Sequence, residues 1–367
     1  MLVRYGADDK GRPVEKAKIY TKNEHKIPLN QIDDDAVKVI SRLKENGFSA
    51  FIVGGAVRDL IVGKKPKDFD IVTDATPSRI KKIFRNSRII GRRFRLVHVF
   101  FGQKIFEVST FRSICDGSVG NAFGTMDEDV MRRDFSLNSL YYDPFKEQVI
   151  DYTNGFNDIK KGILKPVIPL ESIFVEDPVR MLRAVKYSVT TKCKMNRRLK
   201  KKITQSAALL SPISPSRLTE ELMKIINSGY SKEIVSVALD TDLYTYLQPA
   251  ATELIIESRK FEKNYMESLG ELDLLVKNNP EARLGEKLIY IIRDFISTLT
   301  DWQKEVEHHT ATSELYTKTW TQVRNFVLPM NPQRTELEYA IRMVLKSFGV
   351  QVKMPRKRIV LPPEVNS

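Results

Sequence analysis

The sequence predicts an α/β domain followed by an all-α region. Up to about residue 150, short apolar runs with strand spacing alternate with helical patterns and turn residues. From about Asp177 onward the pattern is helical almost to the end of the chain. The 367 residues are enough for two or three domains, and the proportions of 42% hydrophobic and 29% charged residues are those of a globular protein.

The first helix of the α/β region is expected over residues 33–45, with Val37, Ile40 and Leu43 at helical spacing and Gly47 as its stop. Pro77 is suited to the first position of a later helix. A loop rich in Gly, Asp and Ser is expected over 113–127. The other elements are expected, in chain order, at 49–53 (strand), 57–62 (helix), 69–72 (strand), 77–84 (helix), and 96–101 with 105–110 (hairpin).

Both ends of the chain are polar. Residues 1–30 predict a flexible extension without the apolar segment of a secretion signal. Residues 351–367 form a basic, Pro-rich tail. No window of the sequence approaches 18 uncharged apolar residues, so no membrane span is expected. Cys115 and Cys193 are far apart and lack metal-ligand spacing, which favours a reducing cytoplasm.

The chain is basic, with a net charge of +14, and the excess is concentrated in two stretches. Residues 77–106 contain no acid and nine basic residues: Arg79, Lys81, Lys82, Arg85, Arg88, Arg92, Arg93, Arg95 and Lys104. Residues 178–219 contain no acid and eleven Lys or Arg. One such stretch alone is more simply a solvated face. Two of them indicate a polyanion partner, because phosphate contacts release counterions.

Acidic residues in the α/β region indicate a metal site. Asp68 and Asp70 alternate along the expected strand, so both side chains emerge on one face. Two close carboxylates suit a pair of divalent cations about 3.5–4 Å apart, and Mg²⁺ prefers such oxygen ligands. Glu107 occupies an inward position on a later strand and is a third candidate, although it is also compatible with a surface strand acid.

A glycine turn precedes these acids. Gly54 and Gly55 open a helix, where backbone N–H groups and the positive end of the helix dipole suit a triphosphate. Arg58, one turn into that helix, is a candidate partner for a phosphate. The nearby Gly63-Lys64-Lys65 is not a P-loop, because Arg replaces the first glycine at position 58 and Lys replaces Ser or Thr at position 65.

Four motifs together resemble the class II template-independent nucleotidyltransferases, a family within the DNA polymerase β superfamily that contains tRNA CCA-adding enzymes and bacterial poly(A) polymerases. They are 51–60 (FIVGGAVRDL), the pair Asp68 and Asp70, 132–138 (RRDFSLN) and 176–184 (EDPVRMLRA). The resemblance covers roughly residues 25–230. It implies a palm-like catalytic head (31–150), a helical neck (151–235) and a helical body (236–350) that binds RNA, followed by the tail.

The resemblance also implies a reaction and its site. The family transfers nucleotides from a triphosphate to an RNA 3′ end, so we expect ATP, two Mg²⁺ ions held by Asp68, Asp70 and Glu107, and an RNA partner that is single-stranded or a tRNA. Arg132, Arg133, Asp134 and Asn138 resemble the ribose-recognition motif, in which the acid and the amide match a 2′-hydroxyl and the arginines hold the triphosphate. The alternative is a cluster of ion pairs at a strand end.

The motif at 176–184 is expected to read the nucleobase. Asp177 and Arg180 present an acceptor beside a donor, which matches the Watson–Crick edges of adenine and cytosine but not those of uracil and guanine. An Asp before a Pro is equally typical of a helix start. Arg183 completes this motif as a nucleotide-binding candidate. Arg217, in a segment resembling the last neck motif (SPSRLTEEL), is expected to support the base or simply to begin a helix.

Within the family, residues 89–99 (IIGRRFRLVHV) resemble the segment that sets poly(A) polymerases apart, and His25-Lys-Ile-Pro and 63–68 (GKKPKD) resemble the same branch. We therefore expect a poly(A) polymerase, with a CCA- or A-adding tRNA enzyme as the alternative. His98, inside this segment, is also compatible with a packed strand histidine. A non-catalytic RNA-binding protein explains the charge but not the three acids.

Overall fold

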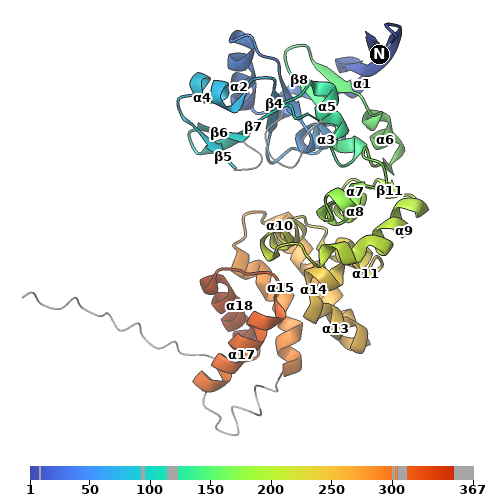
Figure 1. The fold of residues 1–367 in the computed structure, drawn as a ribbon. Helices are drawn as coiled ribbons and strands as arrows, with labels where there is room; N and C mark the ends of the chain where they lie inside the picture. Colours follow the sequence, from blue (N-terminus) through green and yellow to red (C-terminus); the bar gives the residue numbers. More distant parts are fainter. Residues whose placement is uncertain are drawn as a thin grey trace, which may run out of the picture. The chain divides into compact units, whose positions relative to one another are not determined.

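The computed structural model describes residues 1–7, 10–91, 96–113, 123–299, 302, 304 and 312–350. The chain forms two compact units, Met1–Leu209 and Leu210–Ser367. The first contains the sheet and the second contains helices (Figure 1), so the predicted order of α/β before all-α is confirmed. Several predicted features lie outside the described residues, namely Arg92, Arg93, Arg95, Cys115, most of the loop 113–127 and the tail 351–367.

The first unit is built on a nine-stranded sheet of order β1-β2-β9-β8-β3-β4-β7-β6-β5. Strands β4 and β7 run parallel, whereas the other paired neighbours run antiparallel. The strands are β1 Leu2–Ala7, β2 Pro13–Thr21, β3 Ala50–Val53, β4 Asp70–Thr73, β5 Ser87–Ile90, β6 Leu96–Phe101, β7 Lys104–Thr110, β8 Leu140–Asp143 and β9 Gln148–Asp151. The predicted strands at 49–53 and 69–72 and the predicted hairpin correspond to β3, β4, β6 and β7.

Each face of this sheet has its own apolar cluster. On one face, Ile52, Ile71 and Val108 pack with the buried residues of four helices. These helices are α2 Asp34–Glu45, α3 Gly55–Ile61, α4 Pro77–Ile83 and α6 Gly155–Lys161. On the other face, Val53 and Val72 pack with the helix α5 Met126–Met131. Side chains alternate between faces along a strand, so Asp70, two residues from Val72, belongs to the α5 face.

Helix α2 shows how local sequence sets these elements. Asp33 caps it by accepting a hydrogen bond from Asp35 N at 2.9 Å, and Ile40 and Leu43 are fully buried. Gly47, at φ 83°, follows its end as expected. Pro77 likewise opens α4 in its first turn. These starts and stops depend on side chains within one turn, and for this reason the sequence predicts them well.

The prediction of a flexible extension over residues 1–30 is wrong. Strands β1 and β2 form a hairpin, and β2 pairs with β9 so that Ile19 lies opposite Ile150. Tyr20 is buried against Phe156, with ring centroids 4.1 Å apart. The partner strand comes more than a hundred residues later in the chain, and a contact at that separation leaves no local signal.

The predicted domain boundaries also differ from the structure. The boundary at 150/151 falls inside strand β9, and the boundary at 235/236 falls inside helix α11 Ser231–Leu239. The chain divides instead between Leu209 and Leu210. The segment after the sheet therefore belongs to the first unit, and it comprises β10 Ile163–Leu164, α7 Ile173–Glu176, α8 Val179–Thr190, β11 Lys194–Met195 and α9 Arg197–Ser206.

The second unit is helical. Its buried Tyr244 and Tyr265 share a hydrogen bond between hydroxyl groups at 2.8 Å. None of the described helices of the chain is both long and apolar enough to cross a membrane. Besides α11, its helices within the described residues are α10 Pro215–Ile226, α12 Tyr244–Leu247, α13 Pro249–Glu257, α14 Arg259–Asn278, α15 Leu284–Leu299, α17 Thr312–Phe326 and α18 Arg334–Ser347.

Candidate active site

The parallel pairing of β4 with β7 brings two of the predicted acids together. Ile71 lies opposite Val108, so Asp70 and Glu107, one residue earlier on each strand, are neighbours. Ile71 and Val108 point into the core, and Asp70 and Glu107 therefore share the opposite, α5 face. Asp68 precedes the strand rather than lying in it, but the exposed, buried, exposed order of residues 68–70 keeps it on the side of Asp70.

The electrostatics of Asp70 reflect the proximity of these acids. Desolvation inside the head is the largest cause that raises the pKa of Asp70 to about 6, even though the residue is open to solvent. The negative charges of Glu107 and Asp68 raise this pKa further, and Arg133 opposes them. Glu107 and Asp68 thus repel the charge of Asp70, and a cation near the three carboxylates would be favoured.

The donor set fits magnesium. In the described part of the chain, no three His, Cys, Asp or Glu side chains gather closely enough to hold a metal ion by themselves. Mg²⁺ typically takes only a few carboxylates and completes its shell with water and triphosphate oxygens. The acids Asp68, Asp70 and Glu107 supply oxygen ligands and negative charge of that kind. His98, opposite Glu107 on β6, lies 3.4 Å from it and faces the same site.

The glycine turn lies at the end of β3, whose last residue, Val53, is paired with Asp70. Gly54 has φ 69° and ψ −126°, a conformation that side chains with a Cβ rarely adopt. A Cβ on Gly54 would lie 3.5 Å from Arg133 Nη1. The turn therefore places backbone groups beside a guanidinium and next to the acids, which is an arrangement suited to a polyphosphate.

Arg133 is held from two sides. Its Nη2 lies 2.8 Å from Asp129 Oδ2, its Nε donates to the Tyr141 hydroxyl at 3.2 Å, and its Nη1 contacts Asn138 O at 3.5 Å. Asp129 also lies 3.6 Å from Arg112 Nε. Asp129 and Arg133 are separated by one helical turn, so the pair was visible in the sequence as an i, i+4 pattern. Sequence reasoning did not single out Asp129, Tyr141 or Arg112.

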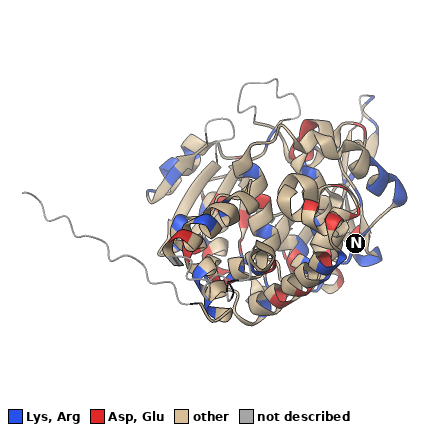
Figure 2. Cartoon of the chain, turned by 90° about the horizontal axis from the view of Figure 1, so that it is seen from below, with Lys and Arg blue, Asp and Glu red and all other residues tan. Residues whose placement is uncertain are grey.

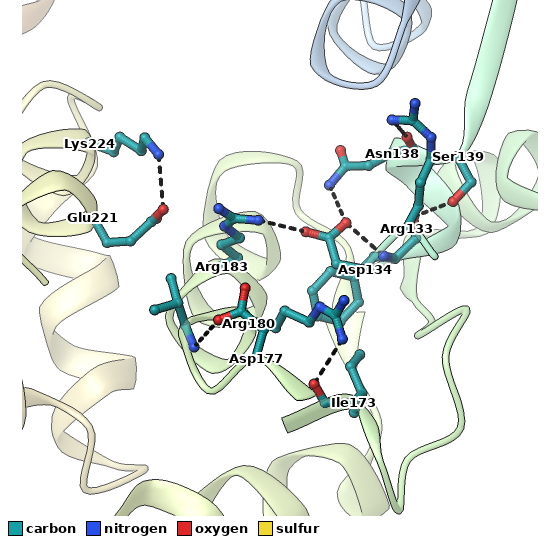
Figure 3. A network of polar contacts seen from close by, with 12 residues as sticks. Arg133, Asp134, Asn138, Ser139, Ile173, Asp177, Arg180, Arg183, Glu221 and Lys224 are labelled. Carbon is teal, nitrogen blue, oxygen red and sulfur yellow. Dashed lines mark hydrogen bonds and ion pairs between the residues drawn. The ribbon is translucent and has the colours of Figure 1, made fainter. Parts of the chain in front are cut away.

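A second chain of contacts links the predicted ribose motif to two arginines, Arg58 and Arg183. Arg58 Nη1 donates to Asn138 Oδ1 at 2.7 Å. Asn138 Nδ2 in turn donates to Asp134 Oδ1 at 3.0 Å (Figure 3). Arg183 Nη1 lies 3.9 Å from Asp134 Oδ2. Four predicted residues from three separate motifs are thus brought together by tertiary structure. Arg132 donates to the carbonyl oxygen of Ser113.

The predicted base-reading residues lie at the start of α8. Asp177 Oδ1 accepts a hydrogen bond from Val179 N at 3.3 Å, so the helix-start interpretation is confirmed, one residue later than expected. Arg180 Nη1 contacts Ile173 O at 3.1 Å (Figure 3). The same nitrogen lies 2.9 Å from Glu176 Oε2. The role of Asp177 and Arg180 toward a nucleobase stays a prediction.

Arg217 belongs to the second unit. It lies in the first turn of α10, where Ser214 and Pro215 occupy the N-cap and first positions as expected. The side chain is exposed. Its role toward a base also stays a prediction.

The basic stretches are partly neutralised by acids from other segments. Lys104 lies 2.8 Å from Asp33 and 3.0 Å from Asp35, and Arg198 lies 2.8 Å from Glu171. Figure 2 shows blue and red positions interspersed over the chain. Helix α9 nevertheless buries only Leu199, Ile203 and Ser206, and its exposed basic residues are Arg197, Arg198, Lys200 and Lys201.

Comparisons with known proteins agree with this architecture. Residues 50–165 match the family described as Poly A polymerase head domain, and residues 194–255 match the one described as Probable RNA and SrmB- binding site of polymerase A. The crystal structure of the Bacillus stearothermophilus CCA-adding enzyme in complex with CTP has the same fold. Its TM-score is 0.56 at 24% identity, over 88% of this chain and 91% of that one.

Two curated relatives are similar in sequence. Poly(A) polymerase I of Escherichia coli O6:H1 is 40% identical over 256 residues, 65% of this chain and 55% of that protein. The CCA-adding enzyme of Lactobacillus helveticus is 34% identical over 226 residues, 59% of this chain and 56% of that protein. The chain therefore spans a little over half the length of each.

The fold and these matches place the protein in the class of nucleotidyltransferases. The chain belongs to the class II nucleotidyltransferase family, which contains bacterial poly(A) polymerases and CCA-adding enzymes.

Proposed function

We propose that this protein adds AMP units from ATP to RNA 3′ ends without a template, as a poly(A) polymerase, in the cytoplasm where both substrates occur. The observation that carries this proposal is the pairing of Asp70 with Glu107 on one sheet face beside the Gly54 turn, with Asp68 just before the same strand. The relatives support the choice of reaction, because identity to poly(A) polymerase I is 40% and identity to the CCA-adding enzyme is 34%.

In this reaction the RNA 3′-oxygen attacks the α-phosphorus, the bond to the β-phosphate oxygen breaks, and pyrophosphate leaves. Asp68, Asp70 and Glu107 are the residues that would hold Mg²⁺. Bound there, the metal would supply positive charge against the phosphoryl group and activate the attacking hydroxyl. Arg133 and the Gly54–Gly55 backbone contribute positive charge and N–H donors for the triphosphate. Arg132 is assigned to the same triphosphate group.

The remaining predicted residues are assigned to recognition. Asp134 and Asn138 contact the ribose, whereas Asp177 and Arg180 pair with the Watson–Crick edge of adenine, which offers a donor beside an acceptor. Arg217 supports the base, and the exposed basic residues of α9 bind the RNA backbone. Hydrogen bonding at this edge does not separate adenine from cytosine, so the width of the base pocket must exclude CTP.

The proposal is tested by giving the purified chain two RNAs, a tRNA that ends before CCA and an unrelated single-stranded RNA, with each nucleoside triphosphate singly and in a mixture. Long tails of A on both RNAs are the expected result. Addition of only C and A to the tRNA, followed by a stop, would support the second candidate, a CCA-adding enzyme, which the similarity to the Lactobacillus helveticus protein favours. Binding of both RNAs without any addition would support a non-catalytic RNA-binding protein.

A further inference from the structure

Arg58 is held by three side chains, none of which is a phosphate-binding group. Its Nε donates to Asp59 Oδ1 at 2.9 Å, and its Nη2 lies 2.8 Å from the same oxygen. Its Nη1 donates to Asn138 Oδ1 at 2.7 Å. Its Cζ lies 5.0 Å from the centre of the Tyr187 ring on α8. The side chain is only 12% exposed, so the guanidinium has a defined place with its charge matched by Asp59.

The position of the Arg58 guanidinium determines the orientation of the Asn138 side-chain amide. The amide oxygen accepts from Arg58 Nη1. The amide nitrogen donates to Asp134 Oδ1 at 3.0 Å (Figure 3). A flipped amide would set its NH₂ group against the guanidinium and its oxygen against the carboxylate, and both contacts would be repulsive. Arg58 therefore orients Asn138 from one side and Asp134 orients it from the other.

The two oxygens of Asp134 then have different surroundings. Oδ1 accepts from Asn138 Nδ2 and from Phe135 N, the latter at 2.7 Å. Oδ2 lies 3.9 Å from Arg183 Nη1, a separation longer than a hydrogen bond. The carboxylate is only 11% exposed, so its charge needs partners. Oδ2 is thus the oxygen that retains room for a further donor.

We propose that Arg58 is a positioning residue for sugar recognition, which acts through Asn138 so that Asp134 Oδ2 accepts a hydrogen bond from the 2′-hydroxyl of the incoming nucleotide. The inference rests on the proposed function and deepens it, because it assigns Arg58 to the ribose rather than to the phosphates. A carboxylate only accepts hydrogen bonds, and a ribose hydroxyl donates one. A deoxyribose leaves Asp134 without this donor, and a site built for a hydroxyl discriminates against such an analogue.

The test is the ratio of kcat/KM for ATP to kcat/KM for dATP in the full chain. Arg58→Leu and Asn138→Leu are each expected to lower this ratio about tenfold, the effect of losing one hydrogen bond to a charged network. The double variant is expected to lower it no further, because both residues act in one chain of contacts. Arg133→Leu is expected to lower kcat/KM for both nucleotides and to leave the ratio unchanged.

Arg42→Leu is the matched control. Arg42 lies on α2 of the same unit with its Cζ 5.4 Å from the Phe84 ring, so this variant loses a comparable arginine–aromatic contact outside the site. Its ratio is expected to equal that of the wild type. If Arg58→Leu does not fold, Arg58→Lys replaces it, since a lysine keeps the charge but not the planar donors.

An equal loss of kcat/KM for ATP and dATP in the Arg58 variants would overturn the inference and place Arg58 on the triphosphate. If the wild type transfers neither nucleotide, the proposed function fails, and calorimetry of ATP and dATP binding to the same variants decides the sugar question separately. Equal binding of ATP and dATP by the wild type would then overturn the inference as well.

Discussion

Asp129 Oδ2 accepts hydrogen bonds from both Arg133 Nη2 and the Tyr141 hydroxyl, each at 2.8 Å. Burial favours a raised pKa for Asp129, but the charges of Arg133 and Arg112 and the Tyr141 hydrogen bond outweigh it and lower this pKa overall. The carboxylate is therefore ionised, and it fixes the guanidinium that faces the Gly54 turn. The Asp129 side chain is only 2% exposed. The sequence alone did not indicate this residue as part of the site.

Asp129→Asn is expected to destabilise the protein by about 3 kcal/mol, because it leaves Arg133 buried without its counter-charge. Tyr141→Phe removes one hydrogen bond and is expected to cost about 1 kcal/mol. Both variants should raise KM for ATP by loosening Arg133. Urea unfolding and steady-state kinetics measure these effects. An Asp129→Asn protein as stable as the wild type would show that the pair does not hold Arg133.

Asp68→Ala is expected to abolish nucleotide transfer while leaving RNA binding largely intact, since it removes a carboxylate from the proposed metal site but no basic residue. Chelation of divalent cations should likewise abolish nucleotide transfer by the wild type, and added Mg²⁺ should restore that transfer. Glu45→Ala, a change of an exposed acid on α2, is the control and should transfer normally. Near-normal transfer by the Asp68 variant would refute the assignment.

Tyr20→Ala is expected to cost about 3–5 kcal/mol of stability, because the ring is 4% exposed and packs on Phe156 in the core of the head. Tyr5→Ala, on the neighbouring strand β1, is the matched control. Tyr5 is 65% exposed, so its loss should change stability by less than about 0.5 kcal/mol. Chemical unfolding distinguishes the two, and equal, small effects would mean that the N-terminal hairpin does not belong to the folded sheet.

His25 is expected to make stability depend on pH. Its Nδ1 accepts from Ile27 N at 3.0 Å, and its Nε2 lies 2.9 Å from Glu147 O, so only the neutral ring with a proton on Nε2 satisfies both contacts. Burial is the main cause that lowers its pKa below 6.5. The unfolded chain therefore binds more protons than the native one below pH 6.5, and stability falls as the pH is lowered from there.

Replacing His25 by Gln removes this titration. The unfolding free energy of the wild type should drop between pH 7 and pH 5 more steeply than that of His25→Gln, by at most about 1.4 kcal/mol per pH unit for one proton. Urea unfolding at three pH values gives both slopes. Identical slopes would mean that the ring is protonated in the native state as readily as in the unfolded chain.

Features that depend on neighbours in the chain were predictable from the sequence. The cap at Asp33, the stop at Gly47 and the proline at the start of α4 each act within one helical turn, and the structure contains all three. The placement of Asp68 and Asp70 on one side is likewise a property of an extended backbone. The structure shows the expected exposed, buried, exposed order over residues 68–70, although the strand itself begins only at Asp70.

Only the tertiary structure decided which distant groups meet. In the sheet, β2 pairs with β9, and Asp70 lies beside Glu107. The fold also brings together one chain of contacts between the side chains of Arg58, Asn138, Asp134 and Arg183. The sequence by itself determined the order of elements, the candidate residues and the family they resemble. It did not determine their partners, because packing and strand pairing depend on the folded arrangement of segments tens to more than a hundred residues apart, which no local pattern encodes.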